Sequence, residues 1–377
     1  MLQRDVFYIA GYDPRSCRYY YKLLKKNLNQ QNKINHLDLK LSALCFEETL
    51  QGKKNAFCKI VSKHSVSNYY FLDWSDLVQK CWSKSLWDFI CDFIYFLRAY
   101  IFSGIVKVFI QKSKTQLLAG LYPIVYFISS YAMVFFSAYI LWDFLEKWNV
   151  YLATLVVLFY LWVATRVILW GGKRLAVFWL SNIYVFCAKY ALGEVEGVER
   201  LLEGFLGQIM QSLKSNKEEV ILCAHSVGTI FAVSVAARVI EQCKKERLSW
   251  EKLKILTLGQ CIPLVSFQKQ CEKFKEELAI LGDSKVVWFD YTSKIDGACF
   301  PLLDFFRDSG VACKNPPCYL SPRFHKLFLP KTYAKIRYNW YLAHFLYLYA
   351  TEISGEYDYF NFVGGPKILE QKIKGGR

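Results

Sequence analysis

The pattern of hydrophobic and polar positions divides the chain into three parts. Residues 1–85 are mainly polar, with short apolar runs separated by turns, and residues 86–193 are dominated by long apolar runs. Residues 194–377 return to the short alternating pattern of a soluble protein. The pattern predicts two soluble parts, 1–85 and 194–377, separated by a membrane region.

The first part begins with a strand, a turn and a helix. Residues 6–10 are β-branched or aromatic, residues 11–15 form the turn Gly-Tyr-Asp-Pro-Arg, and apolar residues then recur at helical spacing from Tyr20 to Leu28. Two further strands are expected at about 56–62 and 69–73. The first residues lack the pattern of a secretory signal, so we expect the fold to begin here.

Two segments of the membrane region are long and apolar enough to cross a bilayer. Residues 117–142 contain no charged side chain, and residues 150–170 contain only Arg166, which can reach the membrane edge. These segments predict two transmembrane helices.

Two neighbouring segments are predicted to lie in the membrane interface. Residues 86–110 are apolar but interrupted by charged side chains that would be costly in hydrocarbon, namely Asp88, Asp92, Arg98 and Lys107. The apolar run 175–188 has only fourteen residues, which favours an interfacial helix over 175–190. A third span at 175–188 is the alternative.

The charges that flank the two predicted spans indicate their orientation. Lys and Arg lie on the outer flanks, at Lys107, Lys112, Lys114, Lys173 and Arg174. The loop between the spans carries mixed charge. Positive residues favour the cytoplasmic side, so the sequence predicts a two-span protein with both soluble parts in the cytoplasm. The thirteen Cys residues show no disulfide spacing and suit that compartment.

The third part alternates helices and strands, which is typical of an α/β protein with a parallel sheet. The helices are expected at 195–213, 227–243 and about 266–281, and the strands at 220–223, 254–258 and 286–291.

Ser226 lies where the second of these helices follows a buried strand. It is flanked by Ala224 two residues before and Gly228 two residues after, and a nucleophile elbow needs small residues at both positions. The alternative role for Ser226 is that of a helix N-cap.

The sequence Ala-His-Ser-Val-Gly resembles the Gly-His-Ser-x-Gly of lipases and esterases in the α/β-hydrolase superfamily, with Ala224 in place of the first Gly. The resemblance covers residues 194–345 and, more weakly, the strand 6–10. It implies an α/β-hydrolase-like fold, with a mostly parallel sheet covered by helices on both faces and interrupted by a two-helix transmembrane insertion.

The resemblance also implies a catalytic triad in the chain order Ser, acid, His. Asp296 follows the strand 286–291 and is the expected acid, with Asp290 as the alternative. His344 lies in an apolar stretch and is the expected base, with His325 as the alternative.

Oxyanion stabilisation is expected from two backbone N–H groups. Val227 follows the nucleophile at the start of a helix, and Tyr12 lies in the loop after the first strand. Arg15, in the same loop, is expected either to hold an anionic head group of the substrate or to pair with Asp13.

The sequence thus predicts a membrane-anchored serine hydrolase that cleaves ester or thioester bonds of lipid-like substrates. Alternatives are an acyltransferase with the same triad and an inactive scaffold. The net charge of +16 suits an anionic bilayer, and no motif for nucleic-acid binding accompanies it. Neither a metal nor a cofactor is expected, and the sequence does not indicate an oligomeric state.

Overall fold

The computed structural model describes residues 1–48, 54–82 and 86–375. It consists of two compact units. The first, here called the sheet unit, comprises Met1–Cys81 and Cys187–Arg377, and the second, the helical unit, comprises Trp82–Phe186. The predicted boundary between residues 85 and 86 adjoins residues 83–85, which lie outside the described part of the chain.

The sheet unit is built on a mixed, mostly parallel sheet in the order β2-β4-β5-β1-β6-β7-β8-β9, with β3 also paired to β4. Its strands are β1 (Leu2–Ile9), β2 (Lys40–Leu41), β3 (Cys45–Glu48), β4 (Lys54–Val61), β5 (Ser65–Phe71), β6 (Glu219–His225), β7 (Leu253–Leu258), β8 (Val287–Tyr291) and β9 (Cys318–Leu320). All neighbours from β5 to β9 pair in parallel, and β4 is antiparallel to β5. The α/β class expected from the sequence is therefore confirmed.

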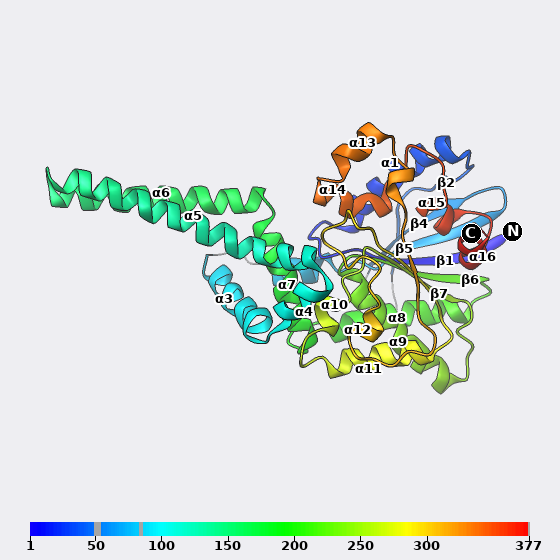
Figure 1. The fold of residues 1–377 in the computed structure, drawn as a ribbon. Helices are drawn as coiled ribbons and strands as arrows, with labels where there is room; N and C mark the ends of the chain where they lie inside the picture. The colour runs from blue at the N-terminus through cyan, green and yellow to red at the C-terminus, as the bar shows by residue number, and fades with distance from the viewer. Residues whose placement is uncertain (49–53, 83–85, 376–377) are drawn as a thin grey trace. The chain divides into compact units, whose positions relative to one another are not determined.

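Helices cover both faces of this sheet, with α8, α9 and α11 on one face and α1, α13, α14 and α15 on the other (Figure 1). The α-helices of the sheet unit are α1 (Cys17–Asn35), α2 (Ser75–Cys81), α8 (Val198–Lys214), α9 (Gly228–Glu246), α10 (Pro263–Ser266), α11 (Glu272–Asp283), α12 (Phe305–Asp308), α13 (Pro330–Ile336), α14 (Trp340–Phe345), α15 (Tyr359–Gly364) and α16 (Leu369–Lys374). The helix expected near 266–281 begins later, as α11, and the short α10 ends where it was expected to start.

Parallel pairing brings distant parts of the chain together at one edge of the sheet. β1 pairs with β5 on one side and with β6 on the other, so that Arg4 lies opposite Glu219. Since parallel strands end at the same edge, the residues that follow β1, β6, β7 and β8 gather there. The predicted site residues from Tyr12 to Asp296 follow these strand ends.

Arg4 ties this sheet to the C-terminal segment. Its guanidinium is fully buried, lies 3.3 Å from the Glu219 carboxylate, and donates hydrogen bonds to the carbonyl oxygens of Phe362, Gly365 and Lys367. One cation therefore joins β1, β6 and the last helices.

The helical unit contains α3 (Leu86–Phe96), a π-helix (Leu97–Phe102), α4 (Ile105–Lys112), α5 (Lys114–Glu146) and α6 (Val150–Arg174). The helix α7 (Val177–Ala191) begins in this unit and ends in the sheet unit. Residues 87–102 and 105–112 are bent by 67° at their junction, where Gly104 has a φ of 83°.

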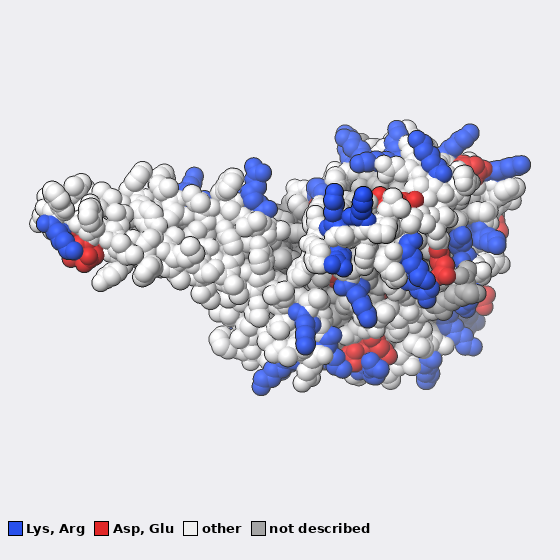
Figure 2. All heavy atoms as spheres, turned by 45° about the horizontal axis from the view of Figure 1, so that its top comes forward, with Lys and Arg blue, Asp and Glu red and all other residues white. Residues whose placement is uncertain are grey.

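In the described part of the chain, two helices are long and apolar enough to cross a membrane, over Lys114–Leu145 and Val150–Arg174. They extend beyond the predicted segments 117–142 and 150–170. Large apolar side chains are exposed along both helices, for example Phe136 at 69% and Leu155 at 67%. Figure 2 shows charged side chains at the tip of this hairpin and few along its sides.

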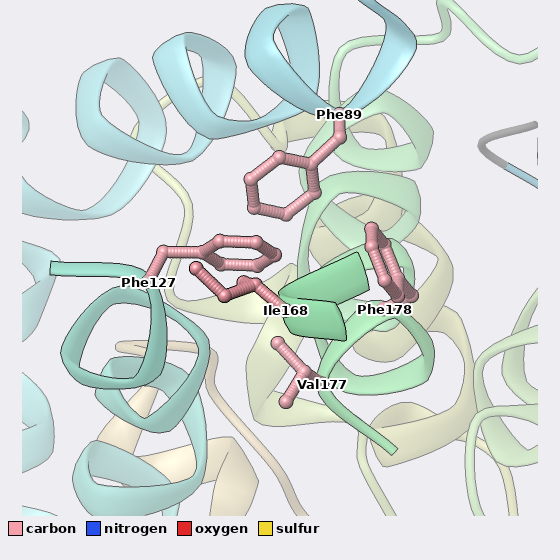
Figure 3. Packing of buried hydrophobic residues seen from close by; sticks show 5 residues of the cluster. All are labelled: Phe89, Phe127, Ile168, Val177 and Phe178. Atoms are coloured by element: carbon pink, nitrogen blue, oxygen red, sulfur yellow. The ribbon is translucent and has the colours of Figure 1, made fainter. Parts of the chain in front are cut away.

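The helical unit has its own aromatic core. Phe89, Phe127, Ile168, Val177 and Phe178 pack together, and Figure 3 shows how they converge from α3, α5, α6 and α7. The hairpin is also joined by polar contacts, because Tyr126 donates a 2.8 Å hydrogen bond to the Ile168 carbonyl and Ser137 lies 2.6 Å from the Tyr160 hydroxyl.

The two predicted interfacial helices have different structures. Residues 86–112 form the bent pair described above, which could cross a membrane only if both pieces counted as one span. The helix α7 is buried along most of its length, and Val177 and Cys187 are fully buried. It therefore lacks the exposed apolar face expected of a helix that lies in the membrane surface.

Candidate active site

Ser226 lies in a sharp turn between β6 and α9. Its φ of 57° is in the left-handed region, which a residue with a side chain adopts only under constraint. Hydrogen bonds hold the turn: the Ser226 N–H donates to the Leu258 carbonyl at 2.9 Å, and the Ser226 carbonyl accepts from Thr229 Oγ1 at 2.6 Å and from the Thr229 N–H at 3.1 Å. The turn thus holds Ser226 at the carboxyl edge of the sheet.

Two glycines allow the turn to approach β1. A Cβ added to Gly228 would lie 2.4 Å from the Ala10 carbonyl oxygen and 2.7 Å from that of Ile9. A Cβ added to Gly11 would lie 2.9 Å from the Cβ of Ser226. The loop after β1 therefore lies directly beside Ser226, and only glycine fits at position 228 without displacing backbone.

The structure brings Asp296 and His344 together. His344 Nδ1 lies 2.9 Å from Asp296 Oδ1 and 3.0 Å from Oδ2, and Asp296 is fully buried. Because a carboxylate oxygen accepts, His344 carries its proton on Nδ1 in this pair. Its Nε2 is then the atom available to accept a proton.

Further groups orient the Asp296 carboxylate. Tyr347 donates to Oδ2 at 3.1 Å, and the Ala298 N–H donates to Oδ1 at 3.0 Å. Burial would raise the pKa of Asp296, but the interaction with His344 and the hydrogen bond from the Ala298 N–H outweigh it, so the pKa lies below its ordinary value. Asp296 is therefore ionised and able to hold His344.

His225, next to Ser226, supports His344 from the other side. Its Nε2 donates a 2.8 Å hydrogen bond to the His344 carbonyl oxygen, and the two rings lie 4.7 Å apart. Burial, reinforced by the nearby His344, lowers the pKa of His225 to about 3. His225 is thus neutral at physiological pH and is hydrogen-bonded to the backbone of His344.

Ser226 Oγ makes no hydrogen bond to His344 in the described structure. Among the described residues its hydrogen-bond contact is with Cys261 Sγ, at 3.8 Å, and none is made to His344. Cys261 Sγ in turn lies 3.2 Å from the Ala298 carbonyl, two residues from Asp296. Ser226 is 6% exposed and His344 4%, so both are buried, as Asp296 is.

The two predicted oxyanion donors belong to segments that adjoin Ser226. The Val227 N–H belongs to the first amides of α9, which have no acceptor within their own helix. Tyr12 is buried in the loop that begins at Gly11, with its ring 5.9 Å from the Trp74 ring.

Arg15 is held by Asp13. Arg15 Nε donates to both Asp13 oxygens at 2.8 Å, Nη2 lies 2.5 Å from Oδ2, and the guanidinium stacks 3.8 Å from the Tyr19 ring. The structure therefore shows the pairing with Asp13, the simpler of the two expectations. Contact with a substrate head group stays a prediction.

The alternative acid and base lie apart from this pair. The Asp290 side chain is fully buried, although a strand residue can also face solvent. It accepts a 2.6 Å hydrogen bond from Thr257. Burial raises the pKa of Asp290 to about 7. His325 lies in a short 3₁₀ helix and is exposed, as expected of a surface residue.

Three neighbours of the site were not apparent from the sequence: Cys261 beside Ser226, Tyr347 on Asp296, and His225 on the His344 carbonyl. Only Tyr347 carried a signal, since it lies one helical turn after His344. No group of His, Cys, Asp or Glu in the described part of the chain could hold a metal ion. Comparison of the chain with protein-family models, with curated proteins and with solved structures found no match.

Proposed function

We propose that this protein is a membrane-anchored serine hydrolase with the triad Ser226, His344 and Asp296. The observation that carries the proposal is the left-handed backbone of Ser226 at a strand-to-helix turn, next to a buried His–Asp pair. A non-glycine residue in this conformation is costly, and such strain is concentrated at functional sites. A helix N-cap would not need it.

The order of the strands supports an α/β-hydrolase-like arrangement. β6 lies between its parallel neighbours β1 and β7, and the acid follows β8, one strand further. The loop after β1, which carries Tyr12, is thereby brought beside the nucleophile, where this superfamily has its second oxyanion donor.

In the proposed reaction, His344 Nε2 takes the proton of Ser226 Oγ as the oxygen attacks the acyl carbonyl of an ester. The Val227 and Tyr12 N–H groups stabilise the oxyanion, and Asp296 stabilises the imidazolium. His344 then protonates the departing alcohol or thiol, and water releases the acyl group by the reverse steps. Ser226 Oγ must first turn from Cys261 toward His344.

The contact between Ser226 and Cys261 favours a second candidate, a hydrolase-like scaffold without activity. In that protein the hydroxyl would stay beside the thiol at 3.8 Å and the triad would not assemble. Acyl transfer to another acceptor would use the same residues as hydrolysis.

The topology of the sheet limits how the protein can lie in a membrane. β1 and β6 pair directly, so residues 1–81 and 187–377 must be on one side of the bilayer. The chain between them must then cross an even number of times. α5 and α6 satisfy this as two spans, whereas counting the bent pair 87–112 as a third would not. The flanking Lys and Arg residues favour the cytoplasmic side.

Lipid-like esters are the proposed substrates, because a site tethered to the bilayer meets amphiphiles at high local concentration. The test is covalent labelling of the full chain in detergent with a fluorophosphonate probe, which reacts with activated serines. We expect labelling of the protein and none of Ser226→Ala. Labelling that persists in this variant would refute Ser226 as the nucleophile.

The roles of Asp296 and His344 are tested with matched pairs. Asp296→Asn and His344→Ala should each lower ester hydrolysis by about 10³-fold or more. Asp290→Asn and His325→Ala alter the alternative acid and base, and they should leave the rate of ester hydrolysis nearly unchanged. If the parent protein is folded but is not labelled by the probe, the inactive scaffold is favoured.

A further inference from the structure

A long basic stretch of the sheet unit surrounds α13 and α14. From Ser309 to Thr351 the chain contains six Lys and Arg residues and no Asp or Glu. The surrounding face in Figure 2 is also dominated by Lys and Arg. This local excess of positive charge forms a field that attracts an anionic surface.

Within this stretch, residues 329–341 combine exposed aromatic and basic side chains. We call them the basic-aromatic segment; it contains α13, the turn after it and the start of α14. Tyr338 is 74% exposed, Tyr341 45% and Trp340 40%, and Leu329 is 54% exposed. Exposed aromatic side chains in such number call for a partner.

The basic residues of the segment are exposed, and the neighbouring carboxylate of Glu352 accepts hydrogen bonds from the Leu329 N–H and from Thr332 at the start of the segment. Elsewhere in the basic stretch, Lys314 pairs with Asp283 and Arg323 with Glu356. Among the described residues no ion pair is formed by Lys331, Lys335 or Arg337. Arg337 instead lies over the Tyr338 ring, 4.5 Å from its centre. The positive charge of the segment is therefore directed outward.

We propose that the basic-aromatic segment binds the anionic headgroup region of the bilayer that holds α5 and α6. Tyr and Trp are the residues preferred at the membrane interface, where the ring is buried and the polar end stays hydrated. Lys and Arg beside them are attracted to anionic lipids on the cytoplasmic leaflet. The proposal does not depend on whether Ser226 is reactive.

The position of the segment within the sheet unit fits this role. Trp340 covers Gly297, since a Cβ added there would lie 2.8 Å from the indole ring, and the segment thus lies at the carboxyl edge of the sheet. The chain leaves and re-enters the unit at the same edge. Within the sheet unit, Trp74 precedes the first junction and Tyr190 follows the second. The rings of both contact the Phe231 ring, at centroid distances of 4.6 and 5.4 Å.

A nucleic acid is the other anionic partner that basic residues could serve, but a lipid surface is favoured here. The same chain carries two helices apolar enough to span a membrane, and both chain junctions lie at the edge that presents the segment.

The test is hydrogen exchange of the full chain in nanodiscs. We compare discs of phosphatidylcholine with discs that also contain phosphatidylserine, and follow peptides from residues 329–341. Slower exchange with phosphatidylserine, reversed by added salt, is expected for this segment. Peptides around Lys245, at the far end of α9 and the opposite edge of the sheet, serve as the internal control and should not change.

A triple variant, Lys331→Glu/Lys335→Glu/Arg337→Glu, tests the charge. Each reversal should weaken binding to anionic lipid by about fivefold or more, so the protection should be lost. The midpoint of thermal unfolding in detergent should be unchanged, which shows that the variant is folded. Equal exchange in both discs would overturn the proposal, and so would protection by added RNA but not by phosphatidylserine.

Discussion

Gly228 offers a sharp test of the elbow geometry. In Gly228→Ala the new methyl group would lie 2.4 Å from the Ala10 carbonyl oxygen, about 1 Å closer than an ordinary contact at 3.4 Å. The obstacle is backbone, which has no rotamer to change. The start of α9 must therefore move away from β1, and it carries Val227 and Ser226 with it.

Two magnitudes follow from this shift. Overpacking of this kind costs about 1–3 kcal/mol of unfolding free energy. A displacement of about 1 Å in a catalytic group lowers the rate by about a hundredfold. Gly207→Ala is the matched control, because Gly207 lies in the interior of α8 with nothing within 4 Å of its added Cβ. That change should stabilise the protein by about 0.5–1 kcal/mol.

The assay is the midpoint of thermal unfolding of the full chain in detergent, together with the rate of fluorophosphonate labelling. Gly228→Ala should lower both, whereas Gly207→Ala should raise the midpoint and leave the labelling rate unchanged. If Gly228→Ala unfolds no earlier than the control and labels at the parent rate, the close approach of α9 to β1 is not a constraint.

Three further predictions concern other parts of the molecule. Burial raises the pKa of Asp290 from 3.8 to about 7, so the stability that its neutral form contributes is fully present below about pH 4 and lost as the pH rises through about 7. Asp290→Asn should therefore raise the unfolding midpoint at pH 8 and hardly at pH 4, and equal effects at both would contradict this. Arg4→Met leaves the Glu219 charge buried and should cost about 3–5 kcal/mol in denaturant unfolding, whereas Arg307→Ala, at an exposed position, should change the free energy by less than about 0.5 kcal/mol. An epitope tag inserted after Lys147 should bind antibody on intact cells, while a tag at the C-terminus should bind only after permeabilisation; the reverse result would invert the proposed orientation.

The sequence allowed the main elements of the sheet unit to be predicted because their periodicity is strong. The strands near 220, 255 and 288 and the helices between them are apolar at the spacing of their structure, and β6 and β7 match their predicted ends within two residues. The short strands β2, β3 and β9 have two to four residues, too few to form a pattern. Their pairing is decided by neighbouring strands that are distant in the sequence.

The candidate site was predictable as a set of residues but not as a contact network. The pairing of Asp296 with His344 followed from chain order in a resembling superfamily, across 48 positions. The position of Cys261 beside Ser226 depends on how β7 packs against β6, which no local pattern reports. The burial of α7 could not be predicted either, because its apolar sequence suits either a lipid surface or a protein interior.

The insertion of the helical unit between β5 and β6 has a consequence for biosynthesis. β1 is synthesised first but finds its partner Glu219 of β6 only 215 residues later, after the whole hairpin has emerged. Until then β1 has a bare edge, and closing so large a loop is slow. The sheet can be completed only when the two ends of the hairpin lie on the same side of the membrane in which we propose that it inserts. Insertion that left the two ends of the hairpin on opposite sides would keep β1 and β6 apart, so correct insertion would decide whether the sheet unit folds.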